Sequence, residues 1–119
     1  MVTKEAIDSA LNAHALWKTR LQDVVKNGKS DFKVSSVQKD NECQFGQWIY
    51  KLPEEDTLSE DFITIKNLHA EFHKTAALVL ELALSGKKGE AIKHLEFGGI
   101  YNQITDKLVL ALNAWKSKL

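Results

Sequence analysis

Four side chains that can bind a metal stand out in this 119-residue sequence. His14 falls on the apolar face of one predicted helix, and His69 and His73 lie four residues apart in another. Histidines at this spacing project from adjacent turns of one helical face, so both can bind one ion. Cys43 is the only cysteine in the chain. Three imidazoles and one thiol make four ligands, the number that a tetrahedral zinc ion takes.

Hydrophobic periodicity predicts three long helices and one short one. The first long helix runs from an N-cap at Thr3 to Asn27-Gly28, and the second from a capping box at Thr57 to Ser85-Gly86. The third begins near Lys88 and continues to Lys118. A short helix over residues 43–51 carries the cysteine, after a connecting loop over residues 29–42 with a turn around Ser35-Ser36. The expected fold is all-α, a single domain over residues 1–119 built as an antiparallel four-helix bundle.

The predicted ligands share one level of this bundle. His14 lies about 17 Å into its helix, and His69 and His73 lie roughly 18–24 Å into theirs, at 1.5 Å per residue. Gly98-Gly99 interrupts the last helix near its middle, so we expect the pair to let a backbone pass close to the site. The other inward positions of that helix are predicted to be Ile92, Leu95, Leu108, Leu112 and Trp115, and Leu58 is predicted to open the inward stripe of the second long helix.

Other interpretations compete with a zinc site. A single histidine on an apolar face is more often a satisfied core residue than a ligand, and Trp17, Trp48 and Trp115 are expected to be core residues. A zinc hydrolase would need a general base, and Glu71 projects away from the face that His69 and His73 share. A di-iron bundle would need a Glu-x-x-His motif, which is absent. We therefore expect no enzymatic activity.

Composition excludes several further classes. Sixteen basic and sixteen acidic side chains cancel, so nothing favours nucleic acid or an anionic membrane surface. No apolar run is long enough to span a bilayer, and the N-terminus lacks the apolar region of a secretory signal. One cysteine cannot form an internal disulfide, so the expected compartment is the reducing cytoplasm.

Three motifs together resemble the chemoreceptor zinc-binding domain of bacterial signalling proteins. They are His14-x-x-Trp17, Cys43-Gln44-Phe45-Gly46-Gln47-Trp48 and His69-x-x-x-His73. The resemblance covers essentially the whole chain and implies a four-helix bundle that holds zinc through His14, Cys43, His69 and His73. It also implies Trp17, Phe45, Gly46 and Trp48 as supporting residues, beside Gly98 and Gly99. Domains of this family occur on chemoreceptors and diguanylate cyclases, which implies a signalling output module as partner and a homodimer.

The resemblance implies a sensor of zinc or of oxidants such as hypochlorous acid. Zinc keeps Cys43 deprotonated, which is the reactive form, and oxidation to sulfenic acid would weaken its bond to the metal. The short helix over residues 43–51 could then move, which would make the site a cysteine–zinc redox switch. Zinc occupancy itself is the alternative signal, and a structural zinc in a helical interaction module is the third possibility. All three use the same residues.

Overall fold

The computed structural model of the chain describes residues 2–29, 33–37, 44–96 and 98–119. Within these ranges every regular element is an α-helix, which confirms the predicted all-α class. The helices are α1 (Lys4–Asn27), α2 (Val34–Val37), α3 (Gln44–Tyr50), α4 (Glu54–Thr57), α5 (Glu60–Leu84), α6 (Lys88–Leu95) and α7 (Ile100–Ser117).

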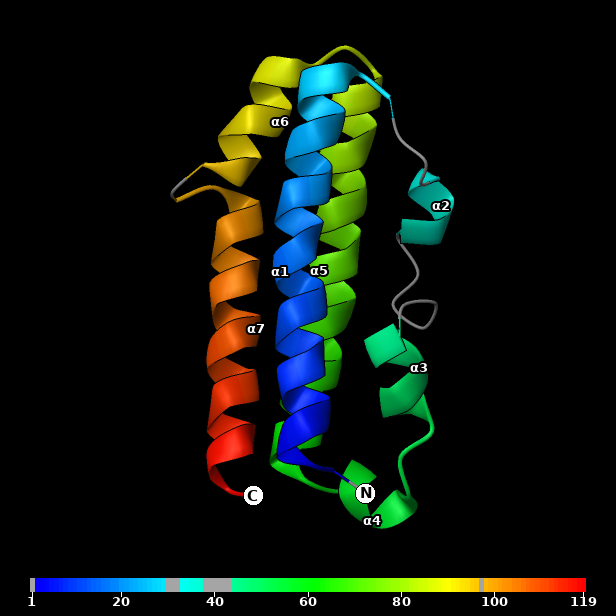
Figure 1. The fold of residues 1–119 in the computed structure, drawn as a ribbon, viewed down its shortest axis with the longest axis vertical. Helices are drawn as coiled ribbons and strands as arrows, with labels where there is room; N and C mark the ends of the chain where they lie inside the picture. The colour runs from blue at the N-terminus through cyan, green and yellow to red at the C-terminus, as the bar shows by residue number, and fades with distance from the viewer. Residues whose placement is uncertain (1, 30–32, 38–43, 97) are drawn as a thin grey trace.

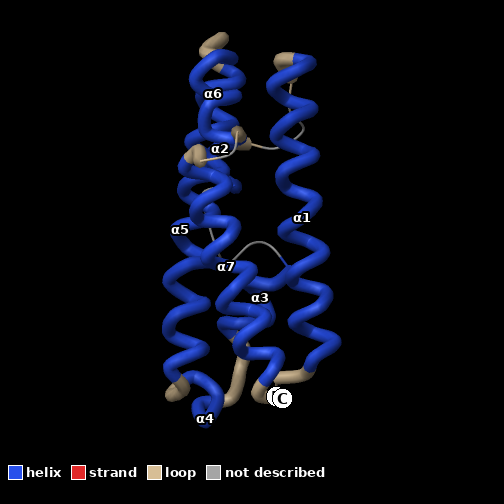
Figure 2. The backbone as a smooth tube through the Cα atoms, turned by 90° about the vertical axis from the view of Figure 1, so that its left-hand side faces the viewer, coloured by secondary structure: helices blue, strands red, loops and turns tan. Residues whose placement is uncertain are grey.

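The long helices α1, α5 and α7 form the body of a helical bundle that measures 45 × 25 × 20 Å (Figure 1). α1 and α5 run in the same direction, and α6 and α7 return in the opposite one. α7 contacts both α1 and α5, which also contact each other. On a further side, α2 contacts α5 and α3 contacts α1, with α3 nearer the end that holds the termini (Figure 2). Short helices therefore stand where a fourth long helix would lie.

The first long helix begins and ends where the sequence predicts. The Thr3 hydroxyl accepts a hydrogen bond from the Ala6 amide at 3.2 Å, which caps the N-terminus of α1. At the other end Gly28 adopts φ = 73°, and its amide donates to the Val24 carbonyl at 2.7 Å. The buried residues recur every three or four positions: Ile7, Ala10, His14, Trp17, Leu21, Val24 and Val25. His14 is in the core because its helical phase puts it there.

The second long helix begins later than predicted. The N-cap of α5 is Ser59, whose hydroxyl accepts from the Phe62 amide at 3.1 Å. Thr57 ends the separate helix α4, and its hydroxyl donates to the Glu54 carbonyl at 2.7 Å. The predicted capping box at Thr57 was therefore wrong, and Leu58 is 75% exposed instead of opening the inward stripe. Thr57 and Ser59 are both possible N-caps by residue type. With Ser59 as the cap, the apolar side chains of α5 face the core.

The last predicted helix is two helices, α6 and α7, with Gly98-Gly99 in the connection between them. Gly98 takes φ = 83°, which lets the chain turn, and the Asn102 side chain donates to the Leu95 carbonyl at 2.9 Å across the break. Ile92 is 43% exposed, so its predicted inward position was wrong. Near the C-terminus, Lys116 Nζ lies 2.6 Å from Asp8 Oδ1, and this ion pair joins the end of α7 to the start of α1.

Among the described residues, no helix combines the length and apolar character that crossing a bilayer requires.

Candidate metal centre

Three buried imidazoles meet between α1 and α5. His14 comes from α1, and His69 and His73 come from α5; their exposed fractions are 3%, 0% and 1%. One ring nitrogen of each lies within 4.8 Å of the corresponding nitrogens of the other two. Nitrogens bound to one zinc ion at about 2.0–2.1 Å would lie roughly 3.3 Å apart in a tetrahedral site. The cluster is therefore close to the dimensions that a single zinc ion needs.

Hydrogen bonds to backbone carbonyls set the proton positions on two of the rings. His14 Nδ1 lies 2.7 Å from the Ala10 carbonyl oxygen, and His73 Nδ1 lies 2.9 Å from the Val37 carbonyl oxygen. A carbonyl oxygen only accepts, so each Nδ1 carries a proton and each neutral ring keeps a lone pair on Nε2. Within the described part of the chain, the buried His14 Nε2 has no hydrogen-bond partner. A metal ion would satisfy this nitrogen, so the residues present fit a metal.

The two histidines of α5 contact each other directly. His69 Nε2 lies 3.0 Å from His73 Nε2. In its neutral form His73 keeps Nε2 as an acceptor, so the proton between the two rings then belongs to His69. This proton occupies the place where a shared ion would sit, so holding an ion with both Nε2 atoms requires it to leave that nitrogen.

The environment keeps the His14 and His69 imidazoles uncharged at neutral pH. Burial lowers the pKa of His14 from 6.5 to about 4, while its hydrogen bond to the Ala10 carbonyl acts in the opposite direction. The pKa of His69 falls from 6.5 to about 2, mainly through burial and in smaller part through repulsion from positive charge on His73 and His14. Both rings are therefore neutral at pH 7. The neutral imidazole is the form that binds zinc.

Aromatic rings close the space around the cluster. The Phe72 ring centre lies 4.8 Å from that of His14 and 5.5 Å from that of His73. Phe45 of α3 lies 5.6 Å from His14 and 4.9 Å from His69, and all four contacts are edge-on. Trp17 lies 6.3 Å from His73. This apolar enclosure removes water from the imidazoles, which is the physical cause of the lowered pKa values.

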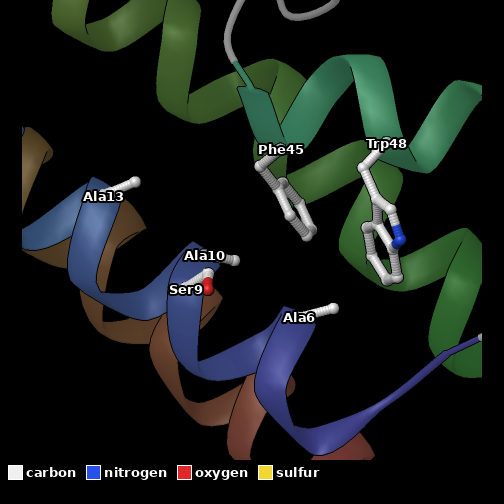
Figure 3. Close-up of a pocket in the computed structure, with 6 residues that line it drawn as sticks. All are labelled: Ala6, Ser9, Ala10, Ala13, Phe45 and Trp48. Atoms are coloured by element: carbon white, nitrogen blue, oxygen red, sulfur yellow. The ribbon is translucent and has the colours of Figure 1, made fainter.

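The short helix α3 packs incompletely against α1. Phe45 and Trp48 extend from α3 toward α1, where the facing side chains are small (Figure 3). A cavity of about 180 Å³ remains between the two helices, lined by Ala6, Ser9, Ala10, Ala13, Phe45 and Trp48. Trp48 also lies 6.3 Å from Trp115, which connects α3 to α7. Two aromatic side chains thus anchor α3 to the bundle, but the small side chains of α1 leave space beneath them.

Cys43, the fourth predicted ligand, lies outside the described residues. It is bonded to Gln44, the first residue of α3, and Phe45 two positions on contacts two of the three histidines. Gly46, predicted from the same motif, is buried in α3. The distance from Cys43 to the cluster stays a prediction.

The glycine pair interrupts the last predicted helix as expected, but the close approach that it permits differs from the predicted one. Gly98 and Gly99 are not inside a helix, and a Cβ at Gly99 would collide with the backbone carbonyl oxygens of Lys93 and His94 in α6. A Cβ at Gly98 would meet nothing within 4 Å. The close approach that the pair permits is therefore between the start of α7 and the backbone at the end of α6. Tyr101, two residues after Gly99, reaches toward the site through its ring contact with Phe72 at 5.5 Å.

Two contributors to the site were missed in the sequence. Phe72 was not predicted to be part of the site, although its place between His69 and His73 puts it on the face that they share. Val37 was assigned to a connecting loop, but it ends the helix α2 and its carbonyl binds His73. The two valines that flank Ser35-Ser36, three positions apart, are the one signal of a buried helical turn there.

A family comparison agrees with this geometry. The model of the family described as "Chemoreceptor zinc-binding domain" matches residues 14–80, more than half of the chain. The chain belongs to this family. The matched range contains His14, Cys43, His69 and His73 and ends within α5, so α6 and α7 lie outside it. No curated protein and no solved structure matches the chain. The family is one of zinc-binding signalling domains, and the three histidines of this member are positioned to hold a metal ion.

Proposed function

We propose that this chemoreceptor zinc-binding domain binds one zinc ion through His14, His69, His73 and Cys43 and acts as a sensory domain. The observation that carries the proposal is the convergence of three buried imidazoles within 4.8 Å. A thiolate beside three neutral imidazoles favours zinc over the harder cations, which take oxygen ligands. Bound zinc would supply a positive charge that keeps the Cys43 sulfur deprotonated.

The sensing chemistry that we propose is oxidation of Cys43. The thiolate sulfur takes the oxygen of hypochlorous acid and becomes a sulfenic acid, while the chlorine is reduced and leaves as chloride. The sulfur of a sulfenic acid is a poorer metal ligand than a thiolate, so the tie between Cys43 and the histidines weakens. α3 follows Cys43 directly and leaves a pocket of about 180 Å³ against α1, so its packing is incomplete on that side, while Phe45 and Ile49 are buried in the core.

The domain would transmit this change to a signalling module of the chemoreceptor or diguanylate cyclase type, as a homodimer in the cytoplasm.

Two other functions use the same site. Zinc occupancy itself could be the signal, because metal binding to a folded site contributes on the order of 10 kcal/mol in zinc-finger peptides. Zinc could also be purely structural. The incomplete packing between α3 and α1 favours the redox switch over the structural role, because a helix packed in this way can respond to loss of the tie at Cys43.

Three measurements on the zinc-loaded protein separate these functions. Hypochlorous acid is added in steps while zinc content, Cys43 oxidation and far-ultraviolet circular dichroism are followed. A redox switch predicts Cys43 oxidation with a conformational change at less than a few equivalents. An occupancy sensor predicts the same change when a chelator removes zinc and no oxidant is present. A structural zinc predicts that Cys43 resists oxidation until the whole domain unfolds.

A further inference from the structure

The contact between α2 and His73 has a role in the metal centre that the ligands alone do not describe. We infer that the backbone carbonyl of Val37 is a positioning group, which holds His73 in the Nδ1–H tautomer and turns its Nε2 lone pair toward His14 and His69. The inference rests on the proposed function only for the identity of the ion. It assigns a part in the site to a segment that carries no metal-binding side chain.

The geometry of this hydrogen bond is specific. His73 Nδ1 and the Val37 oxygen are 2.9 Å apart, although the two residues are separated by 36 positions in the sequence. His73 is 1% exposed and Val37 is 3% exposed, so water does not compete for either atom. Because a carbonyl oxygen accepts but cannot donate, one orientation of the ring and one tautomer satisfy the contact. A ring turned over about χ2 would place Cδ2 against the carbonyl and exchange the positions of Nε2 and Cε1, which would turn the Nε2 lone pair away from the cluster.

Apolar packing places the acceptor. The Val37 side chain is buried in the core, and the partly buried Val34 packs against the same core. The Val37 amide donates to the Lys33 carbonyl at 3.0 Å, which closes the single turn of α2, and this turn contacts α5. A four-residue helix has almost no stability of its own, so α2 exists through its docking on α5. The tautomer of His73 therefore depends on whether α2 is docked.

His14 provides a contrast within the same cluster. Its Nδ1 donates to the Ala10 carbonyl, four residues earlier in α1. That acceptor is local and is present whenever α1 is helical. The acceptor for His73 is tertiary and is lost when α2 leaves α5. Disturbing α2 should therefore release His73 and leave His14 unchanged, which gives the cluster an internal control.

The test weakens the carbonyl while keeping every side chain. Residues 1–42 are synthesised with an ester in place of the amide bond between Val37 and Gln38, and ligated at Cys43 to recombinant residues 43–119. An ester carbonyl is a weaker acceptor than an amide carbonyl. The matched control is the all-amide protein assembled in the same way. All histidines carry ¹⁵N, so long-range nitrogen–proton spectra of the metal-free protein report each tautomer, and zinc affinity is measured by competition with a chromophoric chelator.

We expect His73 to be the Nδ1–H tautomer in the all-amide protein and a mixture in the ester. His14 should stay Nδ1–H in both, and zinc affinity should fall by about 10-fold, the lower end for loss of an outer hydrogen bond to a ligand. Val37→Ala keeps the carbonyl but shrinks the anchor, and should give a smaller shift of the same kind if the ester protein folds poorly.

Two results would overturn the inference. One is an Nε2–H tautomer of His73 in the metal-free all-amide protein. The other is an ester variant with unchanged tautomer and unchanged zinc affinity. Failure of the proposed function is distinguishable: an all-amide protein that shows the expected tautomers but does not bind zinc would refute the zinc site and support the positioning role of Val37.

Discussion

His69 and His73 project from adjacent turns of α5, and their Nε2 atoms lie 3.0 Å apart. One Nε2 of the pair accepts a hydrogen bond, and the other carries the proton that an ion would displace. His14 is the third histidine of the cluster. The buried His14 Nε2 beside this pair has no hydrogen-bond partner among the described residues, and a buried nitrogen without a partner is costly. A metal ion would satisfy it, so the metal content of the protein is the first quantity to measure.

We predict one zinc ion per chain in the protein as purified without chelators. His69→Ala and His73→Ala should each lower zinc affinity by more than the roughly 10- to 100-fold typical of outer hydrogen-bond partners, because each removes a ligand. The matched control is His94→Ala, since His94 lies in α6 and is not part of the cluster. It should leave zinc content unchanged. Stoichiometric zinc in the double variant of His69 and His73 would contradict the site.

The part of the centre on the long helices could be predicted from the sequence. The three-and-four spacing of apolar residues fixes the phase of α1 and α5, and that phase alone turns His14, His69 and His73 inward. The spacing of the α5 pair also follows from the 3.6-residue turn. These features are local, so no knowledge of the tertiary packing is needed to infer them.

The remainder depends on tertiary contacts. Nothing in the local sequence reveals that the Val37 carbonyl will meet His73 at 36 residues' separation, because the polar stretch around Ser35-Ser36 carries too short an apolar pattern. The contact at Gly99 was missed for the same reason, because the atoms that a Cβ there would meet belong to the backbone of α6. The predicted start of a helix is wrong where two residues could serve as the N-cap, as at Thr57 and Ser59.

The metal-free protein should lose stability on acidification. The unfolded chain binds protons at His14 and His69 below about pH 6.5, whereas the folded chain does so only near pH 4 and pH 2. Between these values the unfolded state holds more protons, so the free energy of unfolding rises with pH and becomes flat above about pH 7. Each group contributes a slope of up to about 1.4 kcal/mol per pH unit.

Urea unfolding of chelator-treated protein at several pH values measures this dependence. His14→Leu removes one of the two groups, so its stability should fall less steeply with acid whatever its absolute stability is. Equal stability at pH 7.5 and pH 5.5 in the metal-free parent would show that the two histidines are not kept neutral by burial.

Two glycines of the α6–α7 region, Gly89 and Gly99, should respond to substitution by alanine in opposite ways. A Cβ at Gly99 would lie 2.7 Å from the His94 carbonyl carbon and closer still to two carbonyl oxygens, so Gly99→Ala should separate α6 from α7. The expected cost is about 1–3 kcal/mol, as for overpacking. A Cβ at Gly89 meets nothing within 4 Å, so Gly89→Ala in α6 should stabilise by up to about 1 kcal/mol. Thermal or urea unfolding compares the pair, and equal melting curves would refute the close contact at Gly99.

Oxidation of Cys43 should release α3 from the rest of the bundle. α3 is held by Phe45 against the histidines and by Trp48 against α1 and Trp115, and a cavity of about 180 Å³ lies beneath it. Loss of the tie at Cys43 should therefore open this segment before α1 or α5. Hydrogen exchange of zinc-loaded protein should rise by about tenfold or more across residues 44–50 after mild hypochlorous acid, since each 1.4 kcal/mol of lost docking corresponds to a factor of ten. Exchange in the middle of α1 is the internal control and should not change.

The Cys43→Ser variant separates oxidation of the thiolate from general damage. A neutral hydroxyl is a poor zinc ligand, so α3 of this variant should already exchange faster, and hypochlorous acid should add nothing to it. Oxidant that accelerates exchange equally in the parent and in the serine variant would point to the tryptophans or Met1 as targets. Cys43 fully oxidised to sulfenic acid with α3 still protected would refute the switch, because the thiolate–zinc bond would then not govern the docking of α3. In that case zinc would act through its occupancy or as a structural ion.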